Sequence, residues 1–108
     1  MKIFIVAVSF VFTLVLSARG ADVKAVWENN CAQCHGKDGR ADTKMGQKLS
    51  AKDLTDPKVQ ANFSDAKATQ SIKEGVKENG KTTMKAFGGK LSEEEIKALV
   101  AYVRTLKK

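Results

Sequence analysis

Two cysteines and the only histidine of the chain stand together in the segment Cys31-Ala32-Gln33-Cys34-His35. Thiols at this spacing can each add to a vinyl group of a haem, and the histidine that follows is then held beneath the iron. A neutral imidazole nitrogen is a good ligand for iron. The pattern therefore predicts a haem attachment site in which Cys31 and Cys34 form the thioethers and His35 is the proximal ligand.

The same residue types could also serve a zinc site, a redox disulfide or a pair of ordinary buried thiols. Structural zinc sites usually have four protein ligands, and two Cys plus one His leave a closed Cys/His site one ligand short. A thioredoxin-type motif is expected near a βαβ pattern, and the sequence has no such pattern. Haem attachment is therefore favoured over the other three interpretations.

The opposite side of the iron needs a different ligand, because the chain has no second histidine. Water, methionine and lysine remain. Met45 follows His35 so closely that the chain between them would have to wrap tightly around a haem for Met45 to reach its far face. Met84 lies 49 residues beyond His35, in a segment flanked by glycines, and has enough chain to cross. We predict Met84 as the distal ligand, since a thioether is a soft ligand and His/Met ligation raises the reduction potential; the alternative is a core gap-filler.

An export signal is predicted at the N-terminus. Lys2 precedes an almost wholly apolar run over residues 3–16, and Ala18 and Gly20 are small residues at the positions that a signal peptidase reads. The run is shorter than the ~20 residues that span a bilayer, which argues against an uncleaved anchor. We expect a signal peptide over residues 1–20, one domain over residues 21–108, and a periplasmic location with no stable membrane insertion after cleavage.

A domain of this size buries little apolar surface by itself. A tethered haem would add to its core, so we expect the protein without haem to be largely unfolded. Loss of the signal would lower the formal net charge from +7 to +5. The basic side chains are scattered, which disfavours nucleic-acid binding. They suit docking on an acidic redox partner, for which Lys48, Lys81 and Lys85 are the best candidates, although a merely soluble basic surface is an equal alternative.

Helices are expected on both sides of the motif. A helix over residues 23–30, with Asp22 as N-cap, would place four side chains on one face: Val23, Val26, Trp27 and Asn30. Gly36 and Gly39 then mark a turn. Residues 40–55 have no sustained period and are predicted to be a loop.

Capping residues mark the later helices. Asp56 and Ser64 are predicted N-caps, the first of a short helix and the second of a helix that ends at the Asn-Gly pair at 79–80. Residues 81–90 are predicted to be a loop. Ser92 and Glu95 form a capping box before a last amphipathic helix. Since no alternating strand pattern is present, we predict a compact all-α fold of three to five helices.

The nine residues from Cys31 to Gly39, the segment 53–57 and the segment 84–104 together resemble the class I cytochromes c, and the resemblance covers essentially all of residues 21–108. It implies helices wrapped around one covalently attached haem c, with His35 proximal and Met84 distal. It also implies crossed first and last helices, with Tyr102 as the matching aromatic residue. Lys85 departs from the family, in which a proline often follows the methionine; without its fixed φ we expect a looser ligand loop.

The implied function is that of a soluble monohaem electron carrier, which cycles between Fe(III) and Fe(II) and passes single electrons between redox proteins of a respiratory chain. We expect a monomer that is not an enzyme. Peroxidase or gas-binding chemistry needs an open iron position and a distal acid or base, whereas Met84 would fill that position. The alternative is a small haem subunit dedicated to a larger dehydrogenase or oxidase.

Overall fold

A computed structural model describes residues 19–108, so the predicted signal peptide lies almost entirely outside the described residues. Six helices and one two-stranded hairpin make up this part of the chain. In chain order they are α1 Arg19–Asn30, α2 Ala32–His35, α3 Lys44–Lys48, α4 Pro57–Ala61, α5 Asp65–Glu74, β1 Val76–Glu78, β2 Lys81–Met84 and α6 Glu93–Thr105. The fold is predominantly helical and roughly fits the predicted all-α fold of three to five helices, although it has one more helix and a hairpin that was not expected.

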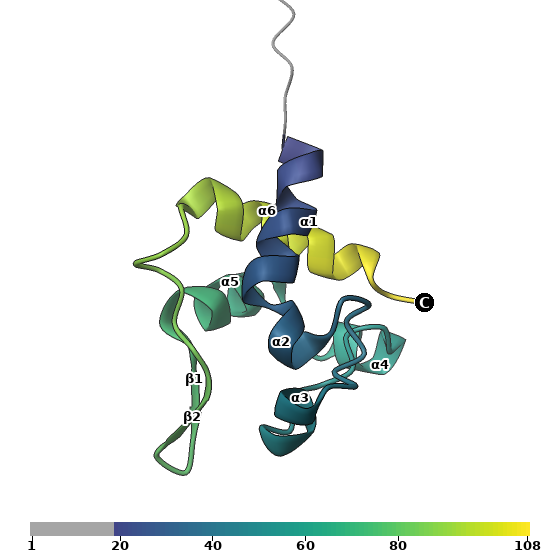
Figure 1. Cartoon of the computed structure of the whole chain (residues 1–108), viewed down its shortest axis with the longest axis vertical. Coiled ribbons are helices and arrows are strands. Elements are labelled where there is room, and N and C mark those ends of the chain that lie inside the picture. The colour runs from purple at the N-terminus through teal and green to yellow at the C-terminus, as the bar shows by residue number, and fades with distance from the viewer. Residues whose placement is uncertain (1–18) are drawn as a thin grey trace, which may run out of the picture.

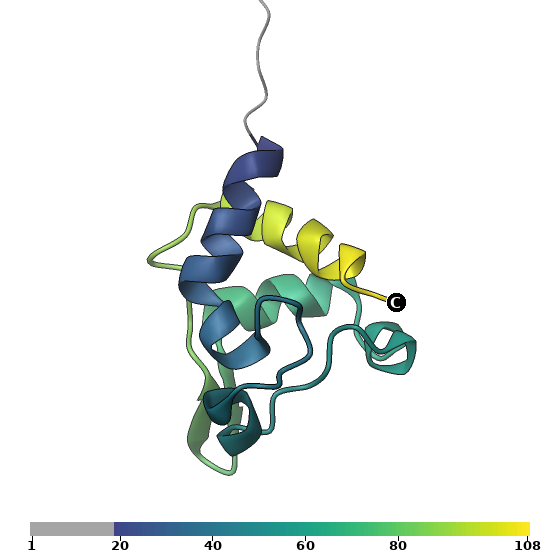
Figure 2. The same ribbon diagram turned by 45° about the vertical axis from the view of Figure 1, so that its right-hand side comes forward.

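Helices α1 and α6 cross and pack against each other (Figures 1 and 2). Trp27 lies at this contact with only 2% of its surface exposed, and its ring centroid is 5.5 Å from that of Tyr102. The crossing expected from the family resemblance is thus confirmed. Helix α1 begins at Arg19 rather than at residue 23, so Asp22 lies in its first turn and the predicted N-cap is wrong. A carboxylate in the first turn still interacts favourably with the helix dipole.

The capping box of α6 is present as predicted. The Ser92 hydroxyl accepts a hydrogen bond from the backbone N–H of Glu95, and the Glu95 carboxylate accepts one from the N–H of Ser92. These bonds satisfy two N–H groups that a helix start would otherwise leave unpaired. The apolar stripe then faces inward, and its buried members are Ile96, Leu99, Val100 and Val103.

Both middle helices begin at their predicted caps. The Asp56 carboxylate accepts from the N–H of Lys58 at the start of α4, and the Ser64 hydroxyl accepts from the N–H of Lys67 at the start of α5. Arg104 of α6 joins these two helices, because its guanidinium donates to the backbone carbonyl of Gln60 in α4 and to the Asp65 carboxylate in α5.

The prediction for residues 75–84 is wrong. Helix α5 ends at Glu74, where Gly75 adopts φ 76°, and an antiparallel hairpin follows. Asn79 and Gly80 both have positive φ, which the commonest two-residue hairpin turn requires. The Asn-Gly pair is therefore a hairpin turn rather than a helix stop. Met84 ends strand β2, paired with Val76, and so does not lie in an irregular loop.

Helix α3 is a second departure, because it lies within the segment predicted to be a loop. The Thr43 hydroxyl caps it by accepting from the N–H of Gly46. In Figures 1 and 2, α3 and the hairpin lie at the same end of the molecule, below α2. None of the helices among residues 19–108 is long and apolar enough to cross a membrane. One apolar cluster forms the core, from Trp27, Cys31, Leu54, Ile72, Phe87, Leu91, Ile96, Leu99, Val100 and Val103.

Candidate haem-binding site

The cysteine–histidine motif forms a single helical turn that continues the path of α1. The N–H of Cys31 donates to the Trp27 carbonyl over 2.8 Å, and the N–H of His35 donates to the Cys31 carbonyl over 2.9 Å. Gly36 then ends the turn with φ 79°, a conformation that costs glycine little. Because residues three or four apart lie on one side of a helix, both thiols and the imidazole are held within one short, hydrogen-bonded unit.

Both thiols are free, and neither cysteine is in a disulfide. Cys31 lies in the core with 8% of its surface exposed, whereas Cys34 is half-buried. Burial, together with the nearby Cys34, raises the pKa of the Cys31 thiol to about 11, so this side chain is an uncharged thiol at neutral pH. Reduced thiols are the form that thioether formation with a haem requires.

His35 has the properties of an iron ligand. Burial lowers the pKa of its imidazole, so the ring is neutral at neutral pH. Its Nδ1 atom is buried and has no hydrogen-bond partner among the described residues. Buried polar atoms are nearly always paired, and a neutral imidazole with a free nitrogen can bind a metal. The Trp27 ring lies beside it, with ring centroids 5.7 Å apart. The motif residues therefore fit a covalently tethered, histidine-ligated haem.

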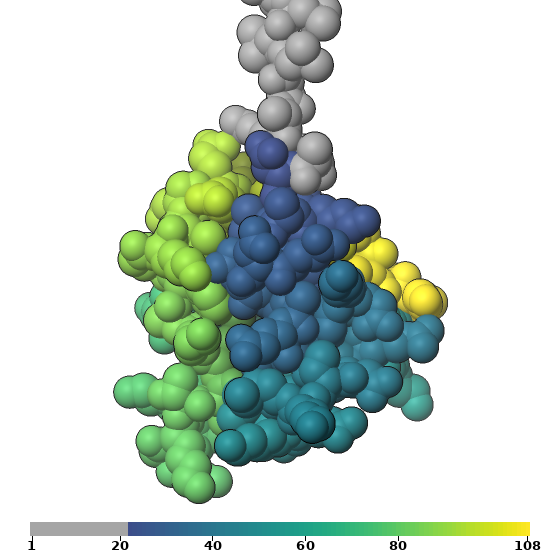
Figure 3. Space-filling view, in the orientation of Figure 1, coloured from purple at the N-terminus to yellow at the C-terminus, as the bar shows by residue number. Residues whose placement is uncertain are grey.

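Met84 contacts the same apolar cluster that contains Cys31, with its side chain half-buried. Its backbone is held closely: a Cβ built on Gly75 would lie 2.6 Å from the Met84 carbonyl oxygen. Just beyond, the N–H of Phe87 donates to the Ile72 carbonyl over 2.8 Å, which ties the segment to α5. In Figure 3, which has the orientation of Figure 1, the segments that contain the hairpin and α3 both lie below α2.

The lysines predicted to guide a partner are all exposed. Lys48 belongs to α3, Lys81 begins β2, and Lys85 directly follows Met84. They therefore belong to the two segments that lie at the end of the molecule below α2. Met45, the methionine set aside as a distal ligand, lies on α3 and is 36% exposed.

The sequence did not predict two side-chain hydrogen bonds to backbone carbonyls in and next to the motif. The Trp27 indole N–H donates to the Gly36 carbonyl over 3.0 Å, and the Thr43 hydroxyl donates to the Cys34 carbonyl over 2.8 Å. Each partner lies nine residues away along the chain. Such tertiary contacts have no sequence periodicity, although Thr43 could have been recognised as an N-cap residue.

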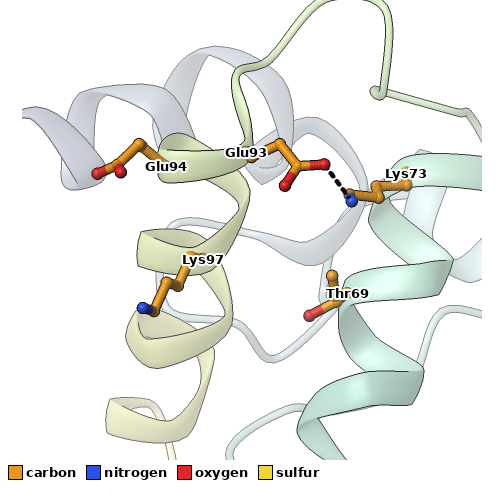
Figure 4. Close-up of a pocket in the computed structure, with 5 residues that line it drawn as sticks. All are labelled: Thr69, Lys73, Glu93, Glu94 and Lys97. Carbon is orange, nitrogen blue, oxygen red and sulfur yellow. Dashed lines mark hydrogen bonds and ion pairs between the residues drawn. The ribbon is translucent and has the colours of Figure 1, made fainter.

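A surface hollow of about 350 Å³ lies between α5 and α6, away from the motif (Figure 4). Its charges are mixed, and Lys73 forms an ion pair with Glu93, with 2.6 Å between Nζ and Oε1. The residues that line it are Thr69, Lys73, Glu93, Glu94 and Lys97. None of them is a residue predicted to bind haem.

Known proteins resemble this chain in sequence and in fold. Residues 18–103 match the family model described as cytochrome C oxidase, cbb3-type, subunit III. The cbb3-type cytochrome c oxidase subunit FixP of Azorhizobium caulinodans is 39% identical over 88 residues, which are 82% of this chain and 26% of FixP. Cytochrome c6 of a Synechococcus species is 36% identical over 91 residues, which are 84% of this chain and 73% of that protein. The chain thus spans about a quarter of FixP.

Solved structures agree with these matches. The KustC0563 c-type cytochrome superposes with a TM-score of 0.70 at 39% identity, over 79% of this chain and 96% of that one. A point mutant of the same cytochrome superposes with a TM-score of 0.69 at 38% identity, over 80% of this chain and 99% of that one. The chain therefore belongs to the cytochrome c family, as a small class I c-type cytochrome whose cofactor is covalently bound haem c.

Proposed function

We propose that residues 21–108 form a soluble monohaem electron carrier that passes single electrons between redox proteins of a respiratory chain. The observation that carries this proposal is the motif itself, in which two reduced thiols adjoin a neutral imidazole with an unpaired buried nitrogen. When bound, the haem supplies the Fe(III)/Fe(II) couple. Cys31 and Cys34 would tether it, and His35 would be its proximal iron ligand.

Met84 is the proposed distal ligand. Its side chain reaches the core cluster, and its backbone is fixed by strand pairing with Val76 and by the close approach of Gly75. A methionine held in this way would stay available to the iron of a bound haem throughout electron transfer. We therefore infer an electron carrier rather than a peroxidase or a gas-binding protein, which need an open position on the iron.

An absorption spectrum tests this ligation. Ferric haem with His/Met ligation has a charge-transfer band in the red, which we expect in the wild-type protein and not in Met84→Ala. Met45→Ala is the matched control, because Met45 is exposed on α3, and it should keep the band. A band that survives in Met84→Ala, or disappears in Met45→Ala, would contradict the assignment. Strong binding of carbon monoxide by the native ferrous protein would instead favour the enzyme or gas-binding alternative.

The partners and the location are part of the proposal. The positive net charge of the chain and the exposed Lys48, Lys81 and Lys85 favour a redox protein with an acidic docking face, approached by a monomeric carrier. Cleavage after Gly20 would release the domain into the periplasm, where the haem would be attached.

The match to FixP favours a second candidate, a haem subunit dedicated to a larger dehydrogenase or oxidase. Fractionation of the native organism distinguishes the two. A free carrier should elute at the size of residues 21–108, whereas a dedicated subunit should co-purify with its complex.

A further inference from the structure

Thr43 joins the haem motif to α3 through a single hydroxyl group. This hydroxyl donates to the carbonyl of Cys34 over 2.8 Å and accepts from the N–H of Gly46 over 2.9 Å. Since the hydroxyl has one proton, its orientation is fixed by the two bonds together. The Thr43 hydroxyl therefore links the end of α2 to the first turn of α3.

Gly46 completes the contact by bringing the backbone of α3 very close. A Cβ built on Gly46 would lie 2.2 Å from the Cys34 carbonyl oxygen, 2.8 Å from the Ala41 carbonyl oxygen and 2.9 Å from the Thr43 hydroxyl. The first two of these atoms belong to the backbone, so a side chain at this position would force backbone atoms to move. Gly46 is buried, and its φ is not in the left-handed region, so its role is to permit close approach.

The next two backbone carbonyls, those of His35 and Gly36, also accept hydrogen bonds. His35 accepts from the N–H of Ala41 over 2.8 Å, and Gly36 accepts from the Trp27 indole over 3.0 Å. Consecutive carbonyls from Cys34 to Gly36 are thus each held by a residue outside α2. Of these three carbonyls, that of Cys34 accepts its hydrogen bond from the Thr43 hydroxyl.

We propose that Thr43 is a positioning residue for the haem, which acts with Gly46 as a clamp on the Cys34 carbonyl. The clamp holds the peptide that connects Cys34 to His35, and so would set the orientation in which the His35 imidazole meets the iron of a bound haem. Groups that orient a metal ligand tune the electronic properties of the metal. This inference rests on the proposed roles of Cys34 and His35.

Three substitutions separate the two hydrogen bonds of Thr43. Thr43→Ser keeps the donor to Cys34 and the acceptor for Gly46. Thr43→Asp keeps the helix cap, since aspartate is a good N-cap residue, but an ionised carboxylate cannot donate to the Cys34 carbonyl. Thr43→Val loses both. Thr69→Val is the control, because the Thr69 hydroxyl also donates to a backbone carbonyl over 2.8 Å, on α5 and away from the motif.

The readouts are the paramagnetically shifted haem methyl resonances of the ferric holoprotein and its reduction potential. We expect wild-type values in Thr43→Ser and Thr69→Val, and displaced resonances with a shifted potential in Thr43→Asp and Thr43→Val. Wild-type resonances and potential in Thr43→Asp would overturn the proposal, because they would show that only the cap of α3 matters. Loss of holoprotein in both Thr43→Asp and Thr43→Val would also count against it, since a role in folding alone explains that result.

The mass of the tryptic peptide that contains Cys31 and Cys34 is measured on the same wild-type sample. Haem on this peptide, combined with unchanged Thr43→Asp spectra, would reject the clamp and leave the attachment site intact. A peptide without haem would reject the attachment site itself.

Discussion

At the scale of single residues, Trp27 serves both the fold and the motif. Its ring contacts both Tyr102 of the last helix and His35, and its indole N–H donates to the Gly36 carbonyl at the end of the motif. The indole is therefore satisfied although the side chain is almost fully buried. One side chain thus couples the crossing of α1 and α6 to the environment of the proximal histidine.

Glu93 allows a prediction about pH at this scale. The hydrogen bond and positive charge of Lys73 hold the pKa of its carboxyl below the ordinary value of 4.5. Since the folded-state pKa is depressed, the stabilisation is present above the unfolded-state value and is lost as the pH falls through the folded-state value. Glu93→Gln should therefore be less stable than wild type at pH 7 and equally stable near pH 2. Denaturant unfolding of the holoprotein across this range measures the difference.

Lys73→Gln supplies the control background for this pair. In that background Glu93→Gln should have a smaller effect, with most of its pH dependence removed. Because both side chains are exposed, added salt should also weaken the effect in the wild-type background. An undiminished effect in the Lys73→Gln background would show that Glu93 acts through the dipole of α6 alone.

At the scale of elements, the hairpin is what positions Met84. Gly75 and Gly80 both have φ 76°, so a Cβ at either position costs roughly 1–2 kcal/mol in backbone strain. Only Gly75 is crowded: its Cβ would lie 2.6 Å from the Met84 carbonyl oxygen and 2.9 Å from the Ala86 nitrogen, whereas nothing lies within 4 Å of a Cβ on Gly80. We predict that Gly75→Ala displaces Met84 and weakens the red charge-transfer band, and that Gly80→Ala keeps it.

Thermal melts accompany the spectra of these two variants. The loss of thermal stability in Gly80→Ala should reflect backbone strain alone. The loss in Gly75→Ala should be larger. Equal losses with the band intact in both variants would mean that the approach of Gly75 does not support Met84. The sulfur–iron bond would then depend on other contacts, such as the bond from Phe87 to Ile72.

The elements also show which structural features a sequence reveals. The starts of α4, α5 and α6 were predictable because Asp56, Ser64 and Ser92 each cap a helix through a local hydrogen bond. The hairpin was missed because its strands are short and mostly exposed, so no alternation is visible, and the Asn-Gly pair fits a helix end as well as a turn. Helix α3 has only five residues, too few for a period, and its place depends on the distant Cys34 carbonyl.

At the scale of the whole molecule, the core and the haem motif are not separate. Cys31 and Trp27 belong to the apolar cluster, and Trp27 contacts the predicted proximal ligand His35. The predicted distal ligand, Met84, packs against the same cluster. The tether and His35 could be proposed from the sequence, because they depend on residue types at a short spacing, whereas the crossing of α1 and α6 was expected only from the family resemblance. The clamp by Thr43 and Gly46 could not be proposed from the sequence, since it exists only after α2 and α3 have packed.

This shared core predicts that the fold depends on the cofactor. Ten side chains make up the cluster, and one of them is a cysteine that would tether the haem. A group bound only by the native state stabilises that state, so its loss should leave a small core that cannot hold the fold. We predict that Cys31→Ser, Cys34→Ser protein shows no cooperative melt by circular dichroism. Because a hydroxyl at position 31 would itself be buried, the Cys31→Ala, Cys34→Ala protein is the control, and it should also fail to melt cooperatively. A native-like melt of the alanine variant would assign the instability to the buried hydroxyl and show that the chain folds without haem.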